Sequence, residues 1–182
     1  MGRYQVMHLD FSQIGGTIDE LEKKFDEYMC CRLDDFVDKY RDDYPDTFIN
    51  SFFECKTYTG KLIQITTIAD RLRIPMYLII DEYDNFTNVV LSEKGEEVYH
   101  KMTHAEGFYR DVFKKFKGTF ERIFFTGVSP VTLDDLTSGF NIGWNISTLF
   151  YFDKLLGFST EDVREMFTYY KEVGKLPADC GI

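Results

Sequence analysis

Three carboxylates follow one short apolar segment and could do chemistry together. The segment Met76–Ile80 is followed by Asp81, Glu82 and Asp84. A carboxylate in such a place can hold Mg²⁺, usually through water, against phosphate oxygens. A second carboxylate beside it can orient and polarise an attacking water molecule. The alternative is that Asp81 and Asp84 only cap the next segment or solvate a loop.

The apolar segment itself predicts a β-strand. Met76–Ile80 has no polar break, and Pro75 before it disfavours a helix through that point. Such short runs are typical of strands buried on both faces in the middle of a parallel sheet. Ligands of open α/β sheets bind beyond the carboxyl ends of the strands. Asp81 and Glu82 are therefore expected at a ligand-binding edge, where they have the form of a Walker B element.

Thr126 is the second candidate for a functional side chain. It closes a predicted strand over Phe120–Thr126, and Gly127 follows it. Neighbouring strand ends of a parallel sheet face the same crevice, so the Thr126 hydroxyl is expected near Asp81. There it could contact a γ-phosphate or the attacking water. The alternative is a hydroxyl that only hydrogen-bonds to the turn backbone.

Predicted strands and helices alternate along the rest of the chain. A strand is expected over Tyr4–Leu9, and a capping box at Thr17 and Glu20 opens a long amphipathic helix to Tyr40. The other expected elements are helices over Asp46–Cys55, Lys61–Leu72, Glu96–Met102, Ala105–Lys117 and Ser159–Tyr170, and a short strand near Trp144–Thr148. This alternation predicts one parallel-sheet α/β domain over residues 1–182.

Composition excludes several classes of protein. A hydrophobic fraction of 44% in 182 residues is enough for one domain with a full core. The formal net charge of −10 weakens attraction to phosphate backbones, so nucleic acid is not an expected partner. The cysteines have no C-x-x-C spacing, which favours reduced cysteines in a cytoplasm. No apolar run reaches the roughly 20 residues of a membrane-spanning helix, so no membrane contact is expected.

Two other motifs do not fit. The only Gly-Lys pairs, Gly60-Lys61 and Gly174-Lys175, are each followed by Leu, and neither matches the phosphate loop G-x-x-x-x-G-K-[ST] (Walker A). His100 and His104 have a spacing that can chelate zinc from a helix. Lys101 stands where a metalloprotease would have Glu, so two exposed helix histidines are the favoured interpretation. No G-x-S-x-G element supports a serine nucleophile.

Five blocks of the sequence, taken together and in this order, resemble one family. The blocks are Val6–Ser12, Leu78–Phe86, Phe125–Val131, Asp134–Ile142 and Leu156–Val163. They resemble the predicted AAA-ATPase-like proteins of bacteria, which are P-loop ATPases that often carry a C-terminal nuclease-like domain.

The resemblance implies a fold, cofactors and residue roles. The fold is a P-loop NTPase-like (AAA-like), three-layer α/β domain that runs from the Walker B element through a sensor to a lid-like C-terminal helix. The cofactors are ATP and Mg²⁺. Asp81 is implied as the Walker B magnesium residue, Glu82 as the catalytic glutamate, and Thr126 as the sensor on the neighbouring strand.

The missing phosphate loop qualifies these expectations. In the family, the strand corresponding to Tyr4–Leu9 follows the phosphate-loop helix. The chain therefore resembles a member that begins downstream of its Walker A loop and ends before any nuclease-like domain. The sheet is then expected to lack its first strand, which lies in its interior. Direct pairing of the neighbouring strands or a partner chain could close this gap. An uncovered edge invites pairing with another copy, so self-association into a homo-oligomer is one expected assembly.

Three functions stay open at this point. The first is an ATPase domain that binds and hydrolyses ATP weakly or not at all without its phosphate loop. The second is a non-catalytic protein-interaction module on the same fold. The third is a different Mg²⁺-dependent enzyme that uses Asp81, Glu82 and Asp84 directly.

Overall fold

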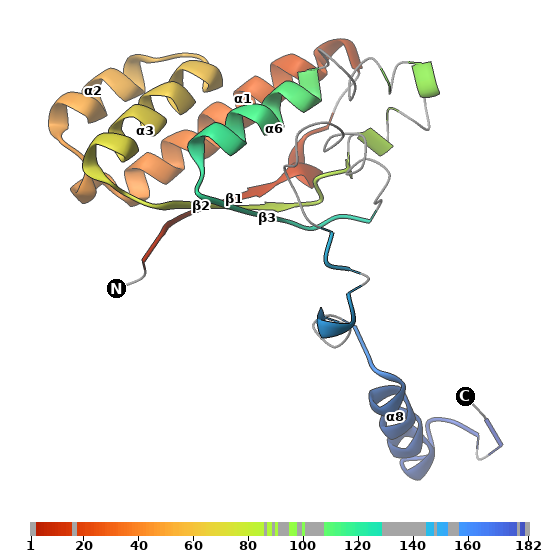
Figure 1. Ribbon diagram of the computed structural model, residues 1–182. Helices are drawn as coiled ribbons and strands as arrows, with labels where there is room; N and C mark the ends of the chain where they lie inside the picture. The colour runs from red at the N-terminus through yellow and green to blue at the C-terminus, as the bar shows by residue number, and fades with distance from the viewer. Residues whose placement is uncertain are drawn as a thin grey trace. The chain divides into compact units, whose positions relative to one another are not determined.

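The computed structural model (Figure 1) describes residues 3–15, 18–85, 87–88, 90, 95–97, 100, 108–128, 145–147, 149–152, 157–177 and 179–180. The chain divides into two compact units, residues 1–142 and 143–182. Each unit is described by itself, and the single domain expected over residues 1–182 stays a prediction.

The first unit is built on a parallel sheet whose described part has three strands. These are β1 (Gln5–Asp10), β2 (Met76–Asp81) and β3 (Arg122–Phe125), in the order β1-β2-β3. The α/β class and the three strands predicted in this unit are confirmed, with small shifts at the strand ends. Since β2 lies between its two neighbours, its carboxyl end is central to the edge at which the site is expected.

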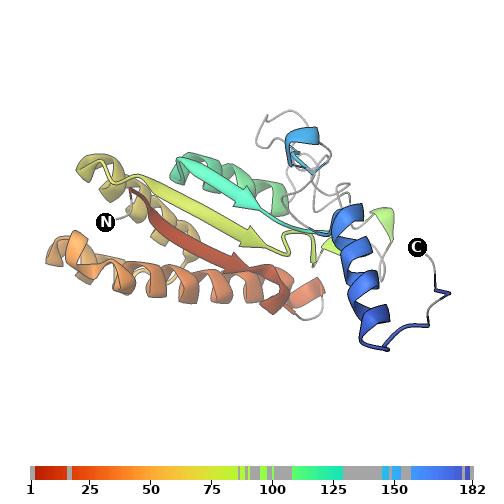
Figure 2. The ribbon, with the colours of Figure 1, turned by 90° about the horizontal axis from the view of Figure 1, so that it is seen from below.

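The connections between the strands are helical. α1 (Ile18–Lys39), α2 (Asp46–Glu54) and α3 (Tyr58–Leu72) join β1 to β2, and α6 (Phe108–Thr119) lies between β2 and β3. Two short 3-10 helices, η1 (Phe11–Gln13) and η2 (Arg41–Asp43), follow β1 and α1. Figures 1 and 2 show that all four α-helices cover the same face of the sheet.

Two predicted helix boundaries are wrong. α3 begins at Tyr58 instead of Lys61, because the Thr57 side chain accepts a hydrogen bond from the Gly60 amide at 3.3 Å and caps the helix. The predicted turn over residues 58–60 is thus the first helical turn. α6 continues through Gly118 to Thr119, so this glycine does not end the helix.

Some predictions fall mainly outside the described residues. These include the capping box at Thr17 and most of the helix expected over Glu96–Met102. The strand expected near Trp144–Thr148 is wrong for residues 145–147, which are not in a strand. There the Ser147 amide donates to the Asn145 side-chain oxygen at 3.0 Å, a local bond that favours a turn.

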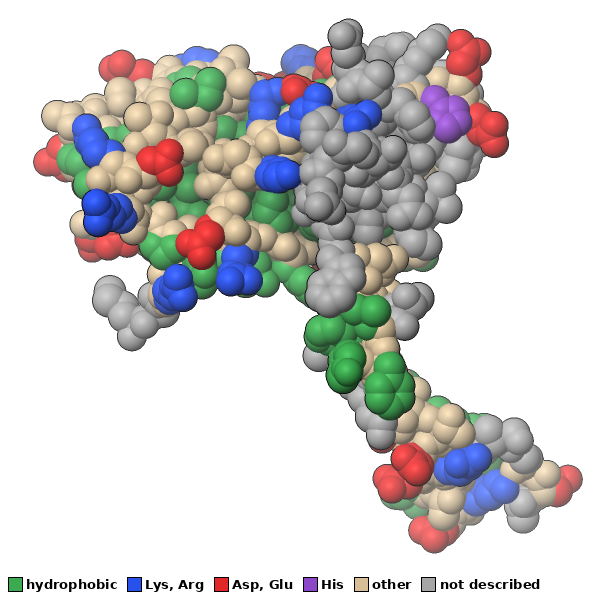
Figure 3. All heavy atoms as spheres, viewed as in Figure 1, with side chains coloured by type: hydrophobic (Ala, Val, Ile, Leu, Met, Phe, Trp, Pro, Cys, Tyr) green, Lys and Arg blue, Asp and Glu red, His purple; other side chains and the backbone are tan. Residues whose placement is uncertain are grey.

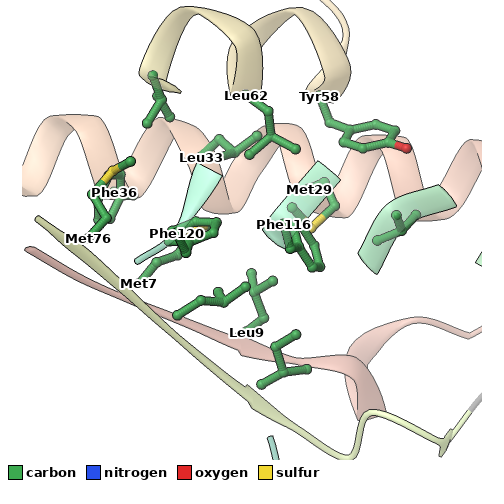
Figure 4. Close-up of a cluster of buried hydrophobic side chains, with 14 of the residues drawn as sticks. Met7, Leu9, Met29, Leu33, Phe36, Tyr58, Leu62, Met76, Phe116 and Phe120 are labelled. Carbon is green, nitrogen blue, oxygen red and sulfur yellow. The ribbon is translucent and has the colours of Figure 1, made fainter. Parts of the chain in front are cut away.

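The core lies between the sheet and the helices (Figure 4). Met7 and Leu9 point into it from β1, Met29 and Leu33 from α1, and Phe116 from α6. These side chains are 0–2% exposed, so each has lost essentially all of its contact with water. This packing holds β1, β2 and α6 in fixed relation and thereby positions the strand ends.

The opposite face of the sheet departs from the prediction that β2 is buried on both faces. Tyr77 and Ile79 of β2 are only half-buried, and His8 and Phe124 on the neighbouring strands are exposed. The physical reason is that α1, α2, α3 and α6 lie on the other face (Figure 2). The second helical layer of the three-layer arrangement stays a prediction.

The second unit contains the 3-10 helix η3 (Phe150–Phe152) and α8 (Thr160–Glu172). Ser159 and Asp162 form a capping box at the start of α8, which confirms the predicted last helix. None of the described helices in either unit has the length and hydropathy needed to cross a bilayer. Figure 3 shows acidic and basic side chains interspersed on the face of the first unit that it displays.

Candidate functional site

The polar residues that follow the strands meet at one edge of the sheet. Asp10 of β1 is the register partner of Asp81 of β2, and Phe125 of β3 is the partner of Ile80. Thr126 therefore comes level with Asp81 on the other side. The sheet is parallel, so all three strands end in the same direction.

Thr126 and Asp81 are in direct contact. The Thr126 hydroxyl donates a hydrogen bond to Oδ1 of Asp81, and the Thr126 amide donates to the Ile80 carbonyl at 2.9 Å. The second bond continues the strand ladder by one residue and fixes the backbone from which the hydroxyl projects. The hydroxyl thus bonds to the neighbouring carboxylate, and the alternative of a purely local backbone bond does not apply.

Glu82 is held in an uncommon backbone conformation. Its φ is +52°, in the left-handed region that side chains other than glycine rarely adopt. Its amide donates to Oδ1 of Asp81 at 3.0 Å, and its carbonyl accepts from the Asn85 amide at 3.0 Å. Arg73 also has a positive φ, but it ends α3 in an ordinary left-handed cap. At Glu82 the conformation makes the chain turn sharply at the strand end and leaves the side chain partly exposed beside Asp81.

Asp84, the third carboxylate of the motif, does not join Asp81 at the exposed edge. It is fully buried, and its two carboxylate oxygens accept from the Val128 amide at 3.2 Å and the Asn88 side-chain amide at 2.9 Å. A carboxylate used in this way holds two loops together and is not presented to a ligand. The arrangement speaks against a metal site shared by Asp81, Glu82 and Asp84.

Gly127 is required by the close approach of these loops. A Cβ atom at this position would overlap with Oδ1 of Asp84 and with the ring of Tyr83. The Tyr83 amide also donates to the Thr126 carbonyl at 3.1 Å. The segment after β2 and the segment after β3 are therefore packed against each other directly behind the contact between Thr126 and Asp81.

Asp10 is a residue of this edge that sequence reasoning did not single out. Its oxygens accept from the Ser12 amide at 3.0 Å and the Gln13 side chain at 3.1 Å. Hydrogen bonding from Ser12, above all, lowers the pKa of the Asp10 carboxyl. A signal was available, since Asp10 closes the first strand as Asp81 closes the second.

The donor set at the edge fits Mg²⁺ only in part. Asp81 is exposed, and within the described part of the chain its Oδ2 has no hydrogen-bond partner. Among those residues, no three His, Cys, Asp or Glu side chains are grouped so that they could hold a metal ion. Mg²⁺ in nucleotide sites keeps several waters and takes one or two carboxylates plus phosphate oxygens, and a single exposed carboxylate suits that arrangement.

Lys61 does not serve as a phosphate-binding lysine. It is buried, and its ammonium group pairs with Oδ1 of Asp34 at 2.6 Å and donates to the Phe52 carbonyl at 3.1 Å. It also lies over the Phe52 ring, 4.3 Å from the ring centre. The Gly60-Lys61 pair is therefore part of the helical core, as its failure to match Walker A indicates.

One hollow of about 450 Å³ is found in the second unit. It is lined by Gly157, Ser159, Glu161, Asp162 and Glu165. Three carboxylates would repel the phosphates of a nucleotide, so this hollow does not suit the expected ligand.

Comparison with known proteins gives one match. Searches of curated proteins and of solved structures found nothing similar to this chain. A family described as predicted AAA-ATPase matches residues 1–137, which include all three strands and the strand-end residues Asp10, Asp81, Glu82 and Thr126. The chain therefore belongs to the predicted AAA-ATPase family.

Proposed function

We propose that the strand-end edge of this chain is the acidic half of a Mg²⁺–nucleoside triphosphate site on a P-loop NTPase-like fold. The observation that carries the proposal is the hydrogen bond from Thr126 to Asp81 at the carboxyl ends of two adjacent parallel strands. Membership in the predicted AAA-ATPase family supports the same assignment. The left-handed backbone of Glu82 supports it too, because such strain is concentrated at functional sites.

Each residue has a distinct role in this proposal. Asp81 would hold Mg²⁺ through its exposed oxygen, and the ion when bound supplies charge neutralisation for the phosphates. Glu82 would orient a water molecule and accept its proton on a carboxylate oxygen. Thr126 fixes the orientation of the Asp81 carboxylate and offers its hydroxyl oxygen to the terminal phosphate or the water.

The sequence has no phosphate-loop motif, and this determines the nucleotide affinity that we expect. The backbone amides and lysine of that loop normally bind the phosphates. Without them, the nucleotide would be held mainly through Mg²⁺ and the strand-end residues. We therefore expect weak binding and slow hydrolysis by this chain.

The first experiment is calorimetric titration of the 182-residue chain with Mg²⁺·ATP. We expect a dissociation constant below about 100 μM, or roughly −5.5 kcal/mol, and loss of the binding in Asp81→Ala. Asp35→Ala removes an exposed carboxylate of α1 and is the matched control. Equal binding by Asp81→Ala, or no binding by a folded wild-type chain, would refute the nucleotide site. Glu82→Gln is expected to keep the binding and abolish turnover.

A non-catalytic interaction module is the second candidate. It is favoured by the half-buried or exposed apolar side chains on the open face of the sheet, Val6, Tyr77, Ile79 and Phe124. We propose self-association through this face or through the edge of β3 as the form that such a function would take. Sedimentation over a concentration series tests it: Phe124→Lys is expected to weaken a dimer, and a wild-type chain that stays monomeric at high concentration would exclude it.

A further inference from the structure

Asp84 lies close to the proposed site and contacts the segment that follows β3, to which Thr126 belongs. Its Oδ1 accepts from the amide of Val128, two residues beyond Thr126. Its neighbour Tyr83 donates its amide to the Thr126 carbonyl at 3.1 Å. We call Tyr83 and Asp84, which make these two hydrogen bonds to the backbone of residues 126–128, the clasp.

Further hydrogen bonds hold Tyr83 and Asp84, the two residues of the clasp, in place. The second carboxylate oxygen of Asp84 is held by Asn88, and the Asp84 carbonyl accepts from the Thr87 hydroxyl at 2.8 Å and the Asn88 amide at 2.9 Å. The Tyr83 carbonyl accepts a hydrogen bond from the Tyr109 hydroxyl of α6. Asp84 can therefore act as a fixed point for the loop that follows β3.

Thr126 depends on that fixed point. Its own strand ends at Phe125, so beyond the ladder the backbone is held by the Ile80 carbonyl of β2 and by the clasp that follows β2. Gly127 allows these hydrogen bonds to form, because any side chain at this position would overlap with Asp84 and Tyr83. Asp84 is fully buried, and its oxygens accept from the Val128 amide and from the Asn88 side chain, so it is not exposed to a ligand.

We propose that Asp84 is a positioning residue of this site, which sets the placement of Thr126 against Asp81 through the Val128 amide. It acts through Thr126 and does not itself touch the nucleotide. The catalytic part of the inference rests on the proposed function, whereas the placement of Thr126 can be measured without any ligand.

The test compares three variants of the full 182-residue chain. Asp84→Ala removes the acceptor for the Val128 amide, and Asp84→Asn keeps one oxygen for it. Asp26→Ala is the matched control, because the Asp26 carboxylate accepts from the Tyr58 amide at 3.1 Å in a bond of the same kind that joins α1 to α3 and does not involve residues 126–128. Thermal unfolding and amide spectra establish that each variant is folded.

The ligand-free readout is amide hydrogen exchange at Val128, with the Thr126 methyl shift measured alongside. Asp84→Ala is expected to speed exchange at Val128 by at least about tenfold, since the amide loses a charged acceptor. Asp84→Asn is expected to restore most of the protection, and Asp26→Ala to change neither signal. Unchanged exchange and an unchanged Thr126 shift in folded Asp84→Ala would overturn the inference. If Asp84→Ala does not fold, the same two signals in Asn88→Ala decide. That variant frees the second carboxylate oxygen of Asp84 and is expected to speed exchange at Val128, and wild-type values of both signals would overturn the inference.

The catalytic readout separates positioning from general damage. With Mg²⁺·ATP, Asp84→Ala is expected to lower kcat by about tenfold or more, because small misplacements at a reacting centre can cost about a hundredfold. The dissociation constant is expected to rise by no more than the several-fold loss predicted for removal of the Thr126 hydroxyl, because Asp81 itself is intact. A loss of affinity with kcat unchanged would contradict a positioning role. If the wild-type chain neither binds nor hydrolyses Mg²⁺·ATP, the proposed function is refuted. The hydrogen-exchange data then still test whether Asp84 positions Thr126.

Discussion

The hydroxyl of Thr126 donates to the carboxylate of Asp81 across the ends of two adjacent parallel strands. The two residues are 45 positions apart in the sequence. Their contact follows from the pairing of β2 with β3, which puts Thr126 one residue beyond the register pair of Ile80 and Phe125. One oxygen of Asp81 is thereby fixed, while the other has no hydrogen-bond partner within the described part of the chain.

Replacing Thr126 with Val tests this relationship directly. Val has nearly the same shape but cannot donate to Asp81, so the carboxylate is expected to reorient. We expect Mg²⁺-dependent nucleotide binding to fall by several-fold, which corresponds to about 1 kcal/mol for the loss of one hydrogen bond. Calorimetry measures the change, and Thr126→Ser, which keeps the hydroxyl, is the control. Equal affinity in the Val and Ser variants would show that the hydroxyl has no part in binding.

Gly127→Ala is expected to destabilise the fold by about 1–3 kcal/mol, as overpacking does. The added Cβ would overlap with Asp84 and the Tyr83 ring, and neither group has room to move because both belong to packed loops. Gly118→Ala is the control, since no atom lies within 4 Å of the added Cβ and the position is helical. It is expected to stabilise by up to about 1 kcal/mol. Urea denaturation of the two variants gives both numbers.

Asp34→Ala is expected to cost about 2 kcal/mol of unfolding free energy, because it removes a charged partner from the buried ammonium of Lys61. Asp35→Ala changes the next position of the same helix and breaks an exposed pair with Arg32 at 2.8 Å. That variant is expected to stay within about 0.5 kcal/mol of wild type. Since both variants put Ala into α1, the difference between their denaturation midpoints isolates the buried pair. Equal midpoints would mean that Lys61 gains nothing from Asp34.

Asp10 gives a prediction about pH. Its pKa is lowered in the folded chain, chiefly by hydrogen bonding from the Ser12 side chain, so the folded state holds this proton less tightly than the unfolded chain does. The resulting stability is present above the unfolded pKa of about 3.9 and is lost as the pH falls through the folded pKa. Ser12→Ala is expected to raise the pKa of Asp10. Carboxyl NMR titration measures the shift, and an unchanged midpoint would assign the effect to the other partners of Asp10.

Local patterns predicted much of the fold. The apolar run before Asp81, the amphipathic period of α1 and the helix start at Ser159 each depend on residues close in sequence, and all three elements are confirmed. The start of α3 was wrong because Thr57 was not recognised as a cap, so a Tyr-Thr-Gly segment was interpreted as a turn. Burial of β2 on both faces was wrong for the described residues, because an apolar strand does not reveal which of its faces will be covered.

The proximity of Thr126 to Asp81 was predictable from the sequence, whereas the separate environment of Asp84 was not. The sequence placed Asp81, Glu82 and Thr126 at neighbouring strand ends, and the structure brings Thr126 to Asp81. It gave no reason to separate Asp84 from the other two carboxylates. That separation arises from a tertiary contact, the Val128 amide, which lies 44 positions away. The backbone conformation of Glu82 was equally hidden, since Glu has no preference for a positive φ.

The left-handed backbone conformation of Glu82 implies that folding stability and the proposed hydrolysis favour different residues at this position. Glycine would adopt this φ without strain, so Glu82→Gly is expected to relieve a cost of order 1 kcal/mol. The same change would remove the carboxylate that is proposed to orient water. Selection for a sturdier fold alone would therefore favour glycine here, and a chain under selection for turnover would retain the glutamate.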